Sequence, residues 1–133
     1  MDLLIVFSIS CICVVAGTPA LSNYAVRSRL TEAIIVADSA KSAITLACME
    51  EPGLNRLDSR AVGFTIHQTQ YVSDVNLEGS CAKATVTLQT RDTGASPDPV
   101  LSFTGVMGPG RLGMEWSCSS TARDPHLPEG CRE

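Results

Sequence analysis

Three residues near the C-terminus belong to the types found in a hydrolytic triad: Ser120, Asp124 and His126. A triad also needs a nucleophile on a strained turn and an oxyanion hole. The Pro-rich sequence around these residues contains no Gly-x-Ser-x-Gly elbow, and chance often places such residues together. We therefore interpret all three as surface loop residues and predict no catalytic site and no enzyme activity.

Metal and phosphate chemistry have equally weak signals. His67, His126 and the cysteines are possible zinc ligands, but no Cys-x-x-Cys or close Cys–His spacing occurs. The Gly-rich run 105–113 lacks the Lys-Ser/Thr ending of a phosphate-binding loop, and a hairpin turn explains it better. The sequence predicts no metal and no cofactor.

Composition limits the class of protein. The 133 residues are 44% hydrophobic and 18% charged, which is typical of one globular domain rather than a disordered chain. The net charge is -4, so the basic footprint of a nucleic-acid-binding domain is missing. Direct binding of nucleic acid is not expected.

The six cysteines fall into two groups. Cys11 and Cys13 lie in an apolar run, and the other four lie beyond it, which indicates an exported protein in an oxidising compartment. Those four cysteines allow three pairings. We favour the pairs that join adjacent features, which are Cys48 with Cys81, between helix and strand, and Cys118 with Cys131, around a C-terminal loop.

The start of the chain is an apolar run over residues 3–18 without a charge. As a helix it would reach roughly 24 Å, short of the ~30 Å of a bilayer core. One interpretation is a signal peptide, residues 1–20, removed from a secreted binding module. The other is a retained helical stem. Arg27 and Arg29 follow the run and could contact lipid phosphate or simply be solvated.

After Pro19 the chain has a helical pattern over residues 24–51. Apolar residues recur three or four positions apart, and charged residues lie mostly off their stripe, which predicts an amphipathic helix. The stripe consists of Val26, Leu30, Ala33, Ala37, Ala40, Ile44 and Ala47. Pro19 is expected to kink the helix or melt it locally near residues 14–19.

The remainder alternates short β-branched runs with Gly, Pro, Asn and Asp. Strands are expected near 62–67, 70–75, 83–91, 99–106 and 111–117. The clearest, residues 84–90, alternates apolar and polar side chains, so one of its faces needs a buried partner. The helix stripe is the available surface. The predicted fold class is therefore α+β, with a long N-terminal helix packed on a four- to five-stranded antiparallel sheet.

Two segments carry a family resemblance. The apolar start followed by residues 19–24, 26–32 and 40–43 resembles the N-terminal helix of bacterial type IVa pilins, and residues 116–131 resemble their C-terminal disulfide loop. The resemblance implies a structural subunit of a type IV pilus. Such filaments serve adhesion, twitching motility and DNA uptake.

The resemblance also divides the chain and implies its partners. Residues 1–23 would be a stem that anchors the subunit in the inner membrane before assembly and packs in the filament core afterwards, and residues 24–133 would be the head. The partners would be copies of the same chain, the assembly machinery and a host surface. Assembly would involve Asp2, Leu3, Ile5, Val6, Phe7 and Pro19, with Asp2 at the place of a Glu in the family. Adhesion would involve Arg123, Asp124 and His126 of the 118–131 loop.

Overall fold

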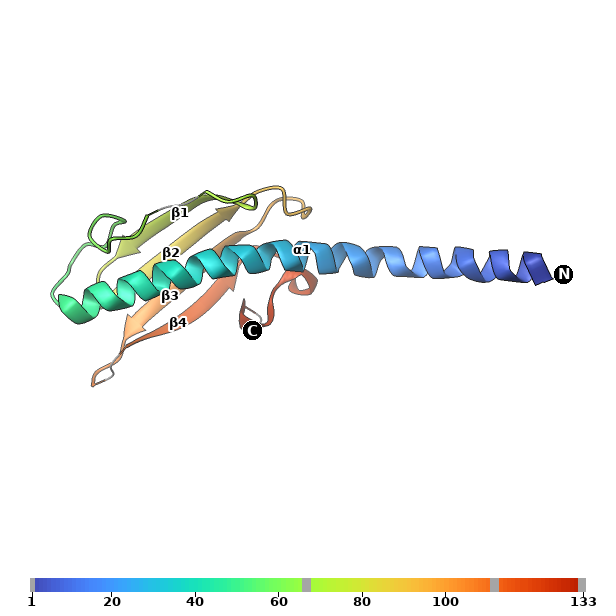
Figure 1. Cartoon of the computed structure of the whole chain (residues 1–133). Helices are drawn as coiled ribbons and strands as arrows, with labels where there is room; N and C mark the ends of the chain where they lie inside the picture. Colours follow the sequence, from blue (N-terminus) through green and yellow to red (C-terminus); the bar gives the residue numbers. More distant parts are fainter. Residues whose placement is uncertain (1, 66–67, 111–112, 132–133) are drawn as a thin grey trace.

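The computed structural model describes residues 2–65, 68–110 and 113–131. The side chains of residues 2–4, 6–20, 124 and 130 are not described. One helix, α1 (Asp2–Glu50), extends from a small head, and its second half lies across the sheet (Figure 1). Two short 3₁₀ turns, η1 (Asp124–His126) and η2 (Glu129–Cys131), follow the sheet.

The described residues form one antiparallel sheet of four strands in the order β1-β2-β3-β4. The strands are β1 (Val72–Gly79), β2 (Lys83–Thr90), β3 (Val100–Met107) and β4 (Met114–Ser120). The predicted α+β fold is confirmed, and the sheet of the described residues has four strands rather than five. The Gly-rich run 105–113 contains the expected β3–β4 hairpin, in which Met107 pairs with Met114.

One strand prediction was wrong, and another differs in its bounds. Residues 62–65 form turn and coil, because Asp58 accepts hydrogen bonds from the Arg60 and Ala61 backbone and starts a turn that competes with strand pairing. Residues 66 and 67, including His67, lie outside the described part. The strand expected at 70–75 begins two residues later and continues to Gly79, where β2 pairs with it.

The helix stripe forms one side of the core. Six of the seven predicted residues are buried, from Val26 to Ile44, while Ala47 is half-buried and Cys48 takes the final position. Ala33, Ala37 and Ala40 are fully buried, and their small side chains let the sheet approach the helix closely. Val86, Leu88 and Leu101 of β2 and β3 belong to the same buried cluster.

Pro19 does not interrupt α1, which stays helical from Asp2 to Glu50 without a sharp bend in Figure 1. The predicted local break was therefore wrong. A proline removes one backbone hydrogen bond, but the turns on both sides keep theirs, and a long helix absorbs this loss without ending.

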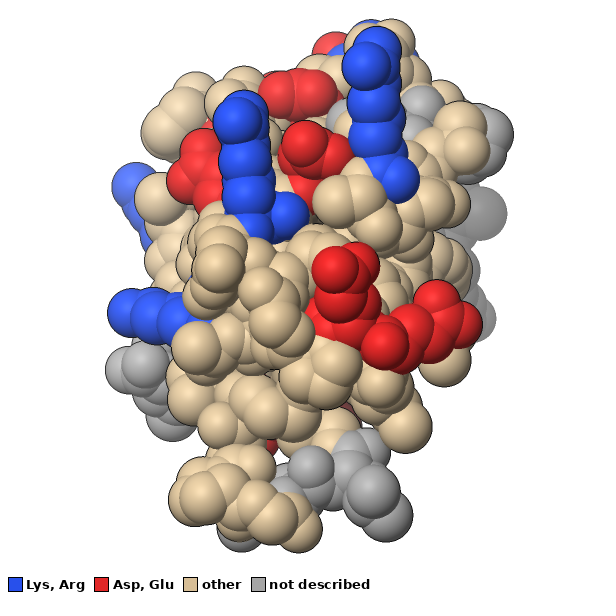
Figure 2. Space-filling view, turned by 90° about the vertical axis from the view of Figure 1, so that its left-hand side faces the viewer, with Lys and Arg blue, Asp and Glu red and all other residues tan. Residues whose placement is uncertain are grey.

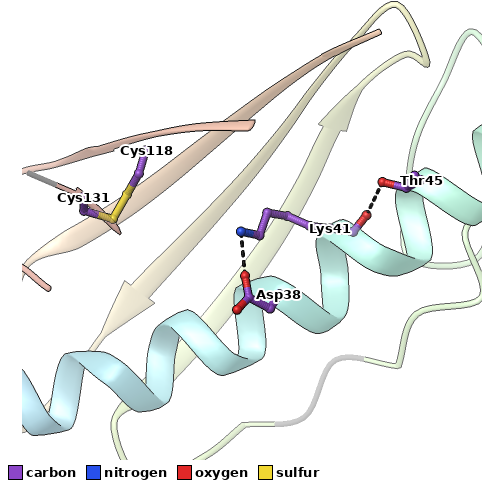
Figure 3. Close-up of polar contacts among 5 residues, drawn as sticks. All are labelled: Asp38, Lys41, Thr45, Cys118 and Cys131. Atoms are coloured by element: carbon purple, nitrogen blue, oxygen red, sulfur yellow. Dashed lines mark hydrogen bonds and ion pairs between the residues drawn. A yellow bond between two sulfur atoms is a disulfide. The ribbon is translucent and has the colours of Figure 1, made fainter. Parts of the chain in front are cut away.

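Both favoured disulfides are present. Cys48 at the end of α1 is bonded to Cys81 before β2, with 5.4 Å between their Cα atoms. Cys118 of β4 is bonded to Cys131, with 5.0 Å between Cα atoms, as drawn in Figure 3. The first bond joins helix to sheet, and the second closes the C-terminal loop.

In the part of the chain that the structure describes, no helix is both long and apolar enough to cross a membrane. The side chains of 2–4 and 6–20, on which the expected inner-membrane anchor depends, lie outside this part.

Candidate functional site

The place where α1 leaves the head is surrounded by two loops, which we call the collar: residues 91–99 between β2 and β3, and residues 121–131 after β4. In Figure 1 one loop lies above the helix and the other below it. Each loop contacts the first turns of α1 that belong to the head. The collar therefore contacts α1 from both loops next to its extended part.

Asp98 organises the 91–99 loop. Its Oδ1 accepts hydrogen bonds from the Thr93 hydroxyl and from the Thr93 N–H, the latter at 2.9 Å, and its Oδ2 accepts one from the Asp92 N–H at 3.1 Å. Thr93 is fully buried. The Thr93 hydroxyl bond is the main cause that lowers the pKa of Asp98, the backbone bonds add to it, and desolvation opposes it.

Arg29 clamps the same loop to the helix. Its Nη1 donates to the Thr93 carbonyl at 3.0 Å and to the Asp92 carbonyl at 3.3 Å, and its guanidinium carbon lies 5.5 Å from the centre of the Tyr71 ring. Gly94, which follows Thr93 in the loop, has a φ of +87°. A Cβ added at Gly94 would lie 2.9 Å from Arg29 Nη1. Both the backbone conformation and the space favour glycine there.

The 121–131 loop is attached on the other side. Arg27 Nη2 donates to the Pro125 carbonyl at 2.9 Å, and His126 Nε2 lies 3.0 Å from Asn23 Oδ1, an amide oxygen that accepts. Arg27 Nε is buried and has no hydrogen-bond partner among the described residues. Arg27 and Arg29, considered as lipid-phosphate ligands from the sequence, therefore contact carbonyls of this same chain.

The two loops and the helix enclose a surface pocket of about 290 Å³. Its wall combines Ser22 of α1 with residues 94–97 and with Thr121, Arg123 and His126. Thr121 is already engaged, because its hydroxyl accepts the Val100 N–H at 2.8 Å. The described wall of this pocket is thus mainly polar.

The predicted assembly residues lie along the extended part of α1. The backbone of Asp2 and Pro19 is helical, but their side chains, and those of Leu3, Val6 and Phe7, lie outside the described residues. Ile5 is described and is 55% exposed. The helix therefore presents residues 2–20 away from the head, as Figure 1 shows.

The predicted adhesion residues differ in their environment. Arg123 is exposed on the pocket rim. His126 is half-buried, and its Nε2 is hydrogen-bonded to Asn23 Oδ1. The side chain of Asp124 lies outside the described residues. Ser120, the third member of the rejected triad, bonds the Val100 carbonyl and the Ala122 N–H.

Sequence reasoning missed Asn23, Thr93 and Asp98. The only signal was the turn composition of residues 92–99, rich in Asp, Thr, Gly and Pro. That composition predicts a loop but not its contact with Arg29, which is more than 60 residues away in the chain.

The architecture defines a class: a subunit whose long helix is half stem and half scaffold for a small antiparallel head. Residues 26–132 match the family model described as pilin, bacterial filament, and the chain belongs to this family. It is also 27% identical over 136 residues to a fimbrial protein named EcpC from Eikenella corrodens, covering 99% of this chain and 87% of that protein. The alignment thus includes nearly all of the apolar start.

Membership of this family determines the general role. The chain is a type IV pilin, a structural subunit that assembles with copies of itself into an extracellular pilus filament. Pilins are structural proteins rather than enzymes. The family assignment supports the pilus subunit rather than the alternative of a secreted binding module.

Proposed function

We propose that residues 1–23 of this pilin form the filament core and that the head forms its outer surface. The observation that supports this is the continuous helix of Asp2–Glu50, which extends past the head with a run, residues 3–18, that has no charge. An apolar rod of this length in water would associate with its own kind or with lipid. Before assembly, the same rod would hold the subunit in the inner membrane.

Asp2 is the charged residue at the start of this rod. In a dry bundle an unpaired carboxylate costs several kcal/mol, so Asp2 would pair with a cation of a neighbouring subunit, such as a terminal amine. Leu3, Ile5, Val6 and Phe7 would supply the apolar packing around that pair.

The test compares the wild-type chain with one deletion and two substitutions of Asp2 in cells that assemble filaments. Deleting residues 1–21 should abolish filaments and release the head in soluble form, while Asp2→Ala should lower filament yield and leave the head folded. Asp2→Glu, which keeps the charge, is the matched control and should retain more yield than Asp2→Ala. Electron microscopy and the sheared-filament fraction measure the outcome, and filaments from the deleted chain would refute the core model.

A finer function, adhesion, is favoured by one observation: Arg123 is exposed at the rim of a covalently closed loop. We propose that the 118–131 loop contacts a host surface through Arg123, with Asp124 beside it and with His126 holding the loop to Asn23. Changing Arg123, Asp124 and His126 together to Ala, with both cysteines retained, should lower adhesion at unchanged filament number. Arg123→Ala alone should account for most of the loss. Equal adhesion at equal piliation would leave the loop a structural feature only.

Twitching motility and DNA uptake would follow from the same filament. No individual residue among those described supports either of them, so we assign none.

A further inference from the structure

The methionines of the described residues gather at one end of the head. Met49 lies in the last turn of α1, Met107 ends β3 and Met114 begins β4. In Figure 1 the end of α1 and the β3–β4 hairpin both lie on the side of the head away from the stem. Thioethers from three different elements therefore come to the same end of the molecule.

One disulfide and one hydrogen bond connect the first two of these methionines. Met49 follows Cys48, whose bond to Cys81 joins α1 to the segment before β2. The residue after Cys81 is Ala82, and its carbonyl oxygen accepts the Met107 N–H at 3.4 Å. The end of the helix and the end of β3 are thus held near each other by bonds on the backbone side of both methionines.

Met107 and Met114 present their side chains to the same face of the sheet. They are direct partners across β3 and β4, and directly opposite residues of an antiparallel pair share a face. Both are half-buried and pack against the hydrophobic core, so this is the face that α1 covers. Their thioethers therefore lie on the side of the sheet from which Met49 approaches.

Met49 and Met107 line one open pocket of about 370 Å³. Met49 is 51% exposed, so the pocket can be reached from solvent. Met114 lines the neighbouring groove, which shares Gly113 with this pocket. Besides the two thioethers, the described wall contains no carboxylate, imidazole or amine and consists of Cys48, Pro52, Gly108, Gly110 and Gly113.

This set of donors selects one class of ion. Thioether sulfur is neutral and soft, and soft ligands select Cu(I), whereas Mg²⁺ and Ca²⁺ require oxygen ligands. In the part of the chain that the structure describes, no three His, Cys, Asp or Glu side chains gather where they could hold a metal ion. The thioethers are separate from the His and Cys ligands that the sequence brought into consideration.

Negative charge lies next to the pocket. Glu50 and Glu51 follow Met49 directly, and both are exposed. They would raise the local concentration of cations without acting as ligands. Figure 2 shows this end of the head, with charged side chains in its upper and middle parts and a mainly tan described surface below them.

We propose that Met49, Met107 and Met114 form a thioether site on the head that binds one soft monovalent cation of the Cu(I) class. Methionine side chains are flexible, so the three can turn toward a common ion without a movement of the backbone. The bound ion would join the end of α1 to the β3–β4 hairpin. The site belongs to the head and requires neither the filament-core role of the stem nor adhesion through the 118–131 loop.

The first test uses silver(I), which is soft and monovalent like Cu(I) and is not a reductant, so the disulfides stay intact. The full-length chain in detergent carries Cys11→Ser and Cys13→Ser, which removes the sulfur atoms of the stem, and its methionine methyl groups are labelled for NMR. Silver(I) nitrate in chloride-free buffer should shift the methyl signals of Met49, Met107 and Met114 together. The shifts should saturate at one ion per chain.

Val106→Met is the matched control for this experiment. Val106 is 47% exposed and precedes Met107 in β3, so its side chain lies on the opposite face of the sheet. The methyl signal of the added methionine should not shift with the other three. Shifts at fewer than three of the native positions, or an equal shift at the added methionine, would show that no such site exists.

The second test measures affinity for Cu(I) itself, by competition with bathocuproine disulfonate in the same background. Met49→Leu, Met107→Leu and Met114→Leu should each weaken binding about tenfold or more, and the triple variant should lose it. Leucine nearly conserves the volume of methionine, so folding should change little, and thermal unfolding checks this. Val106→Met should stay within about twofold of the parent chain. A smaller loss at any of the three native positions would overturn the site.

Discussion

The two loops of the collar contact the same part of α1 but are held by different kinds of interaction. Residues 91–99 depend on the hydrogen bonds of Asp98 and on Arg29, and no disulfide closes them. Residues 121–131 depend on the Cys118–Cys131 bond, and their described contacts with the helix are the Arg27 hydrogen bond to Pro125 and the His126–Asn23 contact. In the first loop the buried side chain of Thr93 faces the interior, and in the second loop the side chain of Leu127 is buried.

The difference shows two ways to fix a loop that is too polar to hold its shape by burial. Hydrogen bonds to one carboxylate act in the folded state and depend on that group staying ionised. A disulfide acts mainly by restricting the unfolded chain and does not titrate. Four substitutions or conditions should separate the two mechanisms, in decreasing order of effect.

The largest effect is expected from opening the C-terminal loop. Replacing Cys118 and Cys131 together by Ser should lower the free energy of unfolding by about 3 kcal/mol, the entropy of closing a loop of this size. Thermal unfolding of the detergent-solubilised full chain measures it. Proteolysis should then cut within 119–130 and spare 91–99. A loss below about 1 kcal/mol would mean that the noncovalent contacts suffice.

Removal of the carboxylate from the other loop should cost slightly less. Asp98→Ala leaves the buried Thr93 hydroxyl and N–H without their acceptor, so unfolding free energy should fall by about 2 kcal/mol. Asp74→Ala, at an exposed position of β1, is the control and should change little. Hydrogen exchange should increase at the Asp92 and Thr93 amides and remain unchanged in 121–131.

The two arginines should not be equivalent. Arg29→Met removes hydrogen bonds to two carbonyls and the contact with Tyr71, and we expect a loss of about 1 kcal/mol. Arg27→Met removes one hydrogen bond but also removes a buried Nε that has no partner in the described part of the chain, so the loss should be about 0.5 kcal/mol or less. Paired thermal melts measure the difference, and a larger loss at Arg27 would reverse the comparison.

The smallest effect is expected from acid. Because the pKa of Asp98 is lowered in the folded state, its contribution is present above the unfolded value of about 3.9 and is lost as pH falls through the folded value. Hydrogen exchange in 91–99 should therefore differ between wild type and Asp98→Asn at pH 6, and the difference should shrink below pH 3.9. The disulfide-closed loop should show no such change. A difference that persists in acid would contradict the ionised carboxylate.

Acid should also act outside the collar, so the Asp98→Asn comparison is needed. The Ala61 N–H bond is the main cause that lowers the pKa of Asp58, and the Arg60 N–H and the charges of Arg56 and Arg60 support it against desolvation. Wild type and variant share this group, and its contribution cancels.

Much of the fold could be predicted because its signals are local. The buried stripe of α1 follows from apolar residues three or four apart, and the alternation in 84–90 correctly indicated β2. The family motifs at both ends of the sequence indicate the pilin class without the tertiary structure. The disulfide pairs could be favoured but not decided, because four cysteines allow three pairings.

The sequence by itself determined the uncharged stem, the amphipathic helix and the existence of polar loops after β2 and β4, since each is a property of neighbouring residues. Only the tertiary structure decided what the loops contact. Arg29 meets Thr93 across 64 positions and Arg27 meets Pro125 across 98, and no local pattern encodes such a pair.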